Sequence, residues 1–80
     1  MHIKIHTFGI AKEICGGSRL QLEVPDLITA GELKQMLTGQ YPRLGGLASF
    51  LLAVNEEFAE PDTVLSAGDE LAIIPPVSGG

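Results

Sequence analysis

The 80-residue sequence predicts an α+β fold, in which one main helix packs on a curved, mixed sheet of four or five strands. Short segments with alternating apolar and polar side chains stand near both ends of the chain, as in half-buried strands. A single segment with helical spacing and its own start signal lies between them. Because a helix and a sheet with apolar faces bury them against each other, these observations predict a two-layer domain.

Residues 2–8 and residues 19–24 are the first two predicted strands, because apolar and polar side chains alternate in both segments. The side chains that share the inner faces are Ile3, Ile5 and Thr7 in the first segment and Leu20, Leu22 and Val24 in the second. The sequence "CGGS" precedes the second segment and is rich in residues that favour turns. The pattern therefore predicts a β-hairpin at the start of the chain.

A helix is predicted to begin at Thr29, since Thr29 and Glu32 have the spacing of a capping box. Ile28 and Leu33 stand at the two positions of a hydrophobic staple around this start. The apolar stripe that faces the sheet is expected to contain Leu33, Met36, Leu37 and Tyr41. Gly39 has the position of a left-handed C-terminal cap, so the helix is expected to end there.

Three further strands are predicted after the helix. They are "FLLAV" (residues 50–54), a brief "FAE" (58–60) that follows a turn, and "ELAII" (70–74). Pro75 and Pro76 close the last strand, because proline has no N–H to donate to a ladder. The order of the elements matches the β-grasp arrangement, in which the first and last strands are neighbours.

The net charge of −5 argues against nucleic acid and anionic membranes as partners, because both are bound through clustered Lys and Arg. The five basic residues are scattered along the chain, and its acidic charge favours basic protein surfaces instead. No apolar run approaches the ~20 residues that span a bilayer, and no secretion signal is evident. We therefore expect a soluble, cytoplasmic protein.

The side chains form no evident catalytic or metal-binding constellation. The single cysteine, Cys15, cannot form an internal disulfide and has no His beside it. His2 and His6 lie on one strand face without a carboxylate pair, and the acidic pairs in turns lack the spacing of a metal loop. We therefore expect no metal and no bound cofactor, which leaves the carboxyl end as the unusual group.

The chain ends in "PPVSGG". A chain-end carboxylate has an ordinary pKa of ~3.5, so it is ionised at neutral pH and is a poor electrophile until ATP-dependent adenylation activates it. The final glycines have no Cβ and fit a narrow channel, while the two prolines favour an extended chain that reaches about 16 Å over residues 76–80. We expect a β-grasp domain at residues 1–75 and a flexible Gly-Gly tail at residues 76–80. A frayed end without function is the alternative.

Residues 68–80, "GDELAIIPPVSGG", closely resemble the end of the molybdopterin synthase small-subunit (MoaD-like) family of sulfur carriers. Three other segments, "FGIAKEI", "AVNEEFA" and "TVLSAGDE", resemble family segments in the same order. The resemblance therefore covers nearly the whole chain, and its tail is the most specific part.

The resemblance implies a ubiquitin-like β-grasp fold and a reactive carboxyl end. The resemblance implies that an E1-like adenylyltransferase uses ATP to adenylate Gly80, and that a sulfur donor system converts the adenylate to a thiocarboxylate. Gly79 has no side chain, so the end of the chain can enter a narrow channel in a partner. The carrier is not catalytic alone: it inserts its tail into the large subunit of molybdopterin synthase, in a heterotetramer, and gives its sulfur to cyclic pyranopterin for molybdenum cofactor biosynthesis.

Alternation also places Phe8 and Ile74 opposite the inner faces of the first and last strands, where Phe58 is expected to join them in an apolar docking patch. With the resemblance, the expected partner-binding residues are Phe8, Lys12, Phe58, Ile74, Pro75, Pro76 and Val77. Lys12 replaces an arginine that is common in the family. The alternatives are a sulfur carrier for thiamine, cysteine or tRNA thiolation, and a non-catalytic ubiquitin-like binding module with an inert tail.

Overall fold

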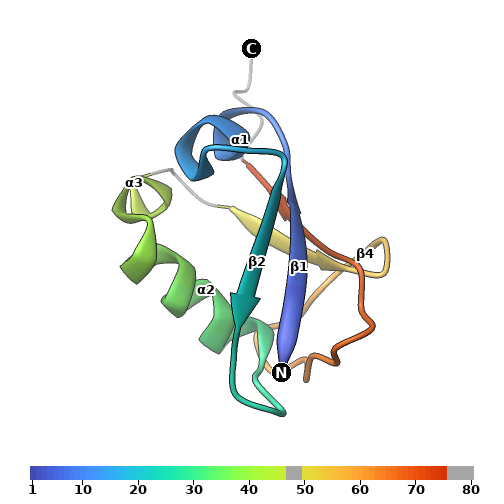
Figure 1. The fold of residues 1–80 in the computed structure, drawn as a ribbon. Coiled ribbons are helices and arrows are strands. Elements are labelled where there is room, and N and C mark those ends of the chain that lie inside the picture. Colours follow the sequence, from blue (N-terminus) through green and yellow to red (C-terminus); the bar gives the residue numbers. More distant parts are fainter. Residues whose placement is uncertain (47–49, 76–80) are drawn as a thin grey trace.

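In the computed structural model, which describes residues 1–46 and 50–75, five strands form one sheet and the longest helix crosses one of its faces (Figure 1). The strands are β1 (His2–Thr7), β2 (Arg19–Glu23), β3 (Leu51–Val54), β4 (Glu57–Phe58) and β5 (Leu71–Ile74). The helices are α1 (Ile10–Cys15), α2 (Ala30–Gln40) and α3 (Pro42–Gly45). The predicted α+β class is therefore confirmed, whereas the predicted tail at residues 76–80 lies outside the described residues.

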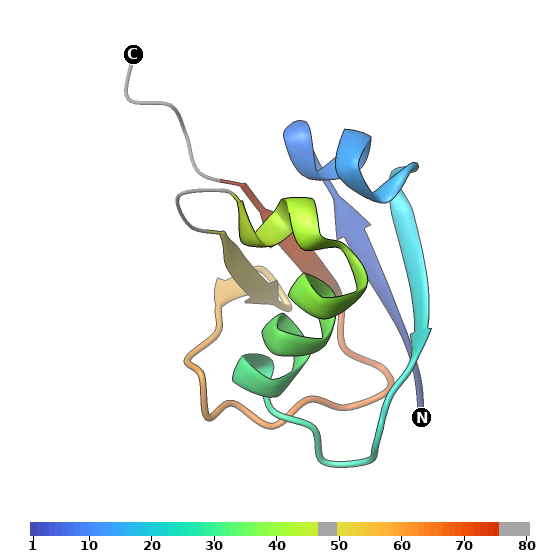
Figure 2. The same cartoon turned by 90° about the vertical axis from the view of Figure 1, so that its left-hand side faces the viewer.

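The strand order is β2-β1-β5-β3-β4, so the first and last strands lie side by side at the centre of the sheet. The pair β1 and β5 is parallel, and the other three neighbouring pairs are antiparallel. Figure 2 shows α2 packed across the inner face of this mixed sheet. This is the β-grasp arrangement that the order of elements predicts.

The core lies between α2 and the inner face of the sheet. Leu33 and Leu37 from the helix are fully buried there, as are Leu71 and Ile73 from β5. The inner-face residues predicted for the first two strands are all buried. Among them is Thr7, whose hydroxyl donates a hydrogen bond to the carbonyl of Gly17 and so meets its polar requirement inside the fold.

The start of α2 is as predicted, but its end is not. Thr29 Oγ1 accepts a hydrogen bond from the Glu32 N–H, and Glu32 Oε1 accepts one from the Thr29 N–H, which completes the capping box. The helix continues through Gly39 to Gln40, and Tyr41, whose φ is −126°, is its C-terminal cap. The residue before a proline disfavours the helical conformation, so Pro42 ends the helix and Gly39 does not.

The connection from β1 to β2 contains a helix that the sequence pattern did not predict. Residues Ile10–Cys15 form α1, and Gly16 ends it with a φ of 80° and an N–H that bonds to the Lys12 carbonyl. The predicted turn at "CGGS" is therefore a helix end rather than a tight hairpin loop. Six residues are too few to show a helical period, although the antiparallel pairing of β1 with β2 is confirmed.

A further helix, α3, follows α2 directly and places Leu44 in the core. The helices α1 and α3 lie at the same end of the sheet (Figure 1). Among the residues that the structure describes, no helix combines the length and the apolar character that crossing a bilayer requires.

Candidate functional site

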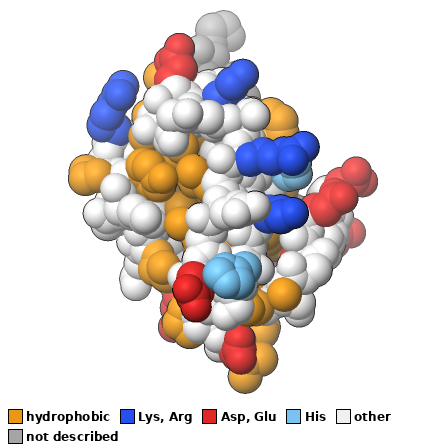
Figure 3. Space-filling model, viewed as in Figure 1, with side chains coloured by type: hydrophobic (Ala, Val, Ile, Leu, Met, Phe, Trp, Pro, Cys, Tyr) orange, Lys and Arg blue, Asp and Glu red, His pale blue; other side chains and the backbone are white. Residues whose placement is uncertain are grey.

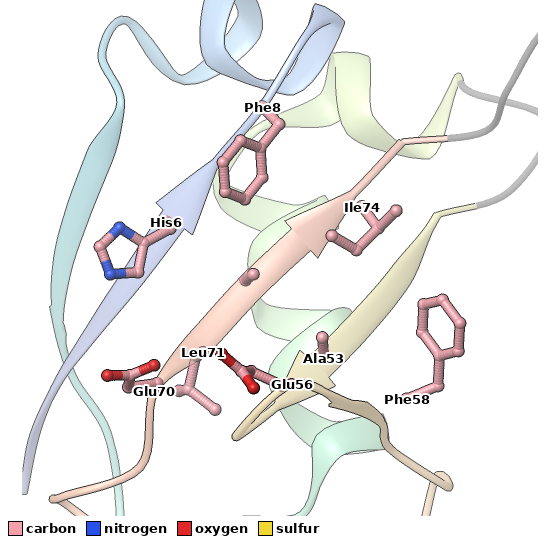
Figure 4. Close-up of a pocket in the computed structure, with 9 residues that line it drawn as sticks. His6, Phe8, Ala53, Glu56, Phe58, Glu70, Leu71 and Ile74 are labelled. Carbon is pink, nitrogen blue, oxygen red and sulfur yellow. The ribbon is translucent and has the colours of Figure 1, made fainter.

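The outer face of the sheet, which α2 leaves uncovered, carries a shallow apolar hollow. The strand register aligns His6, Ala72, Ala53 and Phe58 in one row across four neighbouring strands. The hollow has a volume of about 380 Å³. The residues that line it are His6, Phe8, Ala53, Glu56, Phe58, Glu70, Leu71, Ala72 and Ile74 (Figure 4). The two alanines have short side chains, which accounts for the depression between their larger neighbours.

Large apolar side chains surround this hollow and remain in contact with solvent. Phe8 is 52% exposed and Phe58 is 67% exposed, while Ile74 is half-buried. Leu51 pairs with Ile74 on the neighbouring strand and is 47% exposed. We call Phe8, Leu51, Phe58 and Ile74 the outer patch. Because contiguous exposed apolar surface is typical of interaction sites, the outer patch is the candidate functional site.

The structure brings together the three apolar residues that alternation predicted for this patch. Phe8 and Ile74 lie at one end of the hollow, and Phe58 lies on its far side (Figure 4). Leu51 was not singled out from the sequence, because an apolar run such as "FLLAV" does not indicate which side chains face outward. The binding of a partner by these residues remains a prediction.

A tight turn fixes the other end of the hollow. Asn55 and Glu56 join β3 to β4 with φ values of 52° and 71°, the left-handed pair of a two-residue hairpin turn. The Asn55 side chain accepts a hydrogen bond from the Glu70 N–H at 3.0 Å and donates one to Asp69 at 3.0 Å. The turn is thereby tied to the segment before β5, and both Glu56 and Glu70 line the hollow (Figure 4).

The remaining predicted partner-binding residues fall at or beyond the edge of this site. Lys12 is exposed on α1 and does not line the hollow. Pro75 is half-buried, and its Cγ lies 3.5 Å from the position that a Cβ on Gly9 would occupy. Pro76, Val77, Gly79 and Gly80 lie outside the described residues.

The other candidate reactive groups lie away from the hollow, except for His6. Cys15 ends α1 and packs against the core, where burial raises the pKa of its thiol. A raised pKa reduces the thiolate fraction at neutral pH, so this cysteine is a weaker nucleophile than a free one. Within residues 1–46 and 50–75, no group of three or more His, Cys, Asp and Glu side chains is placed to hold a metal ion.

The chain matches the model of the ThiS family over residues 5–80. It is 36% identical to the molybdopterin synthase sulfur carrier subunit of Drosophila erecta over 83 residues, covering 100% of this chain and 92% of that protein.

Among solved structures, SAMP1 from Haloferax volcanii matches with a TM-score of 0.82 and 28% identity, and the match covers both chains completely. A chain in the complex of subunits 1 and 2 of molybdopterin-converting factor from Helicobacter pylori matches with a TM-score of 0.67 and 26% identity, again over all of both chains.

Proposed function

This chain belongs to the ThiS family, and we propose that it is the sulfur carrier subunit of a molybdopterin synthase. In this role it donates sulfur from a thiocarboxylate on Gly80 to cyclic pyranopterin during molybdenum cofactor biosynthesis. The similarity of the whole of this chain to a molybdopterin synthase sulfur carrier subunit supports the proposal. The similar chain in the Helicobacter pylori complex supports a large synthase subunit as the partner.

The placement of the outer patch beside the end of β5 is the observation that carries the proposal. Ile74 is both the last residue of β5 and part of the patch, and Pro75 follows it directly. A partner that covers the patch therefore also meets the point from which the chain continues towards Gly80. One docking event can in this way bind the carrier and bring its reactive end to the partner's active site.

The chemistry resides on the final carboxyl carbon. The Gly80 carboxylate first attacks the α-phosphorus of ATP on an E1-like adenylyltransferase, which forms an acyl-adenylate and releases pyrophosphate. Sulfide that a sulfur donor delivers then attacks the acyl carbon and displaces AMP, and the product is a thiocarboxylate. Its sulfur forms a bond to a pterin carbon in place of an oxygen substituent, and water then hydrolyses the acyl–sulfur bond. This hydrolysis leaves the sulfur on the pterin and returns an ordinary carboxylate, so the carrier is recycled. Two sulfur atoms on one pterin require two charged carriers.

The test is intact mass spectrometry of the full chain after incubation with ATP, the cognate activating enzyme and a sulfur donor. We expect a mass increase equal to the replacement of one oxygen by sulfur, and no increase when ATP is omitted. The charged carrier with the synthase large subunit should then convert cyclic pyranopterin. Failure to gain sulfur would point to a binding module with an inert tail, and gain without pterin conversion would point to a carrier for another pathway.

The outer patch should supply much of the affinity for the large subunit. We expect Phe58→Ala to weaken binding about tenfold, since truncation of a large aromatic side chain at an interface can cost more than ~1 kcal/mol. Isothermal titration calorimetry with the large subunit measures this effect. Leu27→Ala is the matched control, because Leu27 is also apolar and exposed but does not line the hollow. Equal affinities of the two variants would show that the outer patch is not part of the interface.

A further inference from the structure

We propose that the outer face of the sheet is electrically polarised, so that it accepts the synthase large subunit in one orientation. This inference rests on the proposed function, which supplies the partner. The partner surface that fits has an apolar strip at its centre and carboxylates where it meets β2 and β1. It has Arg or Lys side chains where it meets the turn between β3 and β4.

Arg19 and Lys4 give the β2 and β1 side of this face its positive charge. Arg19 pairs directly with His6, which lines the hollow, and directly opposed residues share one face of a sheet. Lys4 is exposed and stands between the buried Ile3 and Ile5, so it also points outward. Figure 3 shows Lys and Arg side chains beside a histidine over β1 and β2. Basic groups thus gather at the end of β2 and β1 that lies near His6, whereas Glu23 stands at the other end of β2, opposite His2.

Glu56 gives the opposite charge to the end of the hollow at the β3–β4 turn, whereas Glu70 lies nearer to β1, in a depression that Lys4 and His6 also line. Both are exposed and both line the hollow. The hydrogen bonds of Asn55 to Glu70 hold the two backbones together, so the spacing of these two residues is fixed. Acidic side chains protrude at the right-hand edge of Figure 3, beside the β3–β4 turn. The apolar floor of Ala53 and Ala72 therefore lies between Arg19 on one side and Glu56 on the other.

Arg19 and Glu56 are too far apart to neutralise each other. Arg19 lies on β2 and Glu56 lies in the turn between β3 and β4, so three to four strand spacings separate them, which is about 14 to 19 Å at ~4.8 Å each. This separation exceeds the Debye length of about 8 Å at physiological ionic strength. Within the described parts of the chain, the only ion pair joins the Met1 amino group to Asp26. Arg19 and Glu56 therefore act mainly on the part of a partner that lies nearest to each.

These charges can select one orientation of the partner on the sheet, which apolar contact alone does not do. Burial of the outer patch is favourable in any orientation that covers it, because the hydrophobic effect is not directional. A partner rotated by half a turn would place like charges together at both ends, which is repulsive. The allowed orientation fixes where Pro75, beside the patch, meets the partner. The charges thus set the direction of docking, and the apolar centre sets much of its strength.

The test compares Arg19→Glu with Glu56→Lys in calorimetric titrations of the full chain with the cognate large subunit. The two reversals change the net charge of −5 by equal amounts in opposite directions. We expect each to weaken binding about tenfold, because each opposes a local charge of the partner. Attraction through net charge alone would instead make one variant bind more tightly and the other more weakly, and that result would overturn the proposal.

Arg43→Glu and Glu57→Lys are the matched controls. Arg43 is exposed on α3, on the other side of the molecule, and Glu57 pairs with Val54, which packs against the core, so neither side chain faces the hollow. We expect both controls to bind within about twofold of the parent chain, and the losses of the two test variants to shrink near 1 M salt, where the Debye length is about 3 Å. Equal losses in controls and test variants would also overturn the proposal.

Thermal unfolding of every variant shows whether a weaker signal reflects binding or folding. Should a reversal unfold the chain, Arg19→Gln and Glu56→Gln carry the same comparison, with losses of about threefold expected from the removal of one exposed charge contact. If the parent chain is folded and shows no binding to the large subunit, the proposed function fails, and this inference with it. If the parent binds and Arg19→Glu binds equally well, only the inference fails.

Discussion

Removal of Gly80 should abolish the gain of sulfur and lower sulfur transfer to the pterin by more than 100-fold. The deletion moves the terminal carboxyl carbon back by one residue, or about 3.4 Å along an extended chain. A displacement of about 1 Å at a reacting centre can already cost about 100-fold in rate. Intact mass spectrometry measures the first effect, and pterin conversion with the large subunit measures the second.

The stability of the deletion variant separates lost chemistry from lost folding. The buried core of the described residues begins at Ile3 and ends at Ile73, so we expect the unfolding temperature to stay within about 1 °C of the parent. Ser78→Ala is the matched control, since it alters the tail without changing its length or its final glycines. Full sulfur gain by the deletion variant would contradict the assignment of the reactive carbon to Gly80.

Leu33→Ala should be the most destabilising of the substitutions considered. Leu33 is fully buried between α2 and the sheet, and a buried Leu→Ala change costs about 2 to 5 kcal/mol through lost burial and the cavity that remains. For a domain of this size the total stability is about 4 to 12 kcal/mol. A loss of about 3 kcal/mol would lower the unfolding temperature by roughly 12 to 24 °C. Urea denaturation and calorimetry give both quantities.

Met36→Ala provides the control on the same helix. The sequence pattern places Met36 in the apolar stripe with Leu33, but the structure leaves it 36% exposed. We therefore expect a loss of less than about 1 kcal/mol for Met36→Ala, because less apolar surface leaves water at this position. Similar losses for the two variants would show that α2 is rotated about its axis relative to the structure.

The site was predictable in part, because strand alternation is a local rule. Phe8 directly follows the buried Thr7 at the end of β1, and Ile74 follows the buried Ile73 in β5. Their outward direction can therefore be derived from the neighbouring residues in the sequence. Leu51, Glu56 and Glu70 were not predicted as members of the site. Their places depend on the register of β3 against β5 and on the hydrogen bonds of Asn55, which join residues 15 positions apart.

The sequence by itself determined the class of the fold, the inner faces of the first two strands and the start of α2. These features depend on side chains within a few positions of one another, such as the hydroxyl of Thr29 and the carboxylate of Glu32. Only the tertiary structure decided that a helix separates β1 from β2, and that Met36 lies partly outside the core. The polarised face has the same origin: it forms because β5 inserts between β1 and β3, which places residues from opposite ends of the chain on one surface.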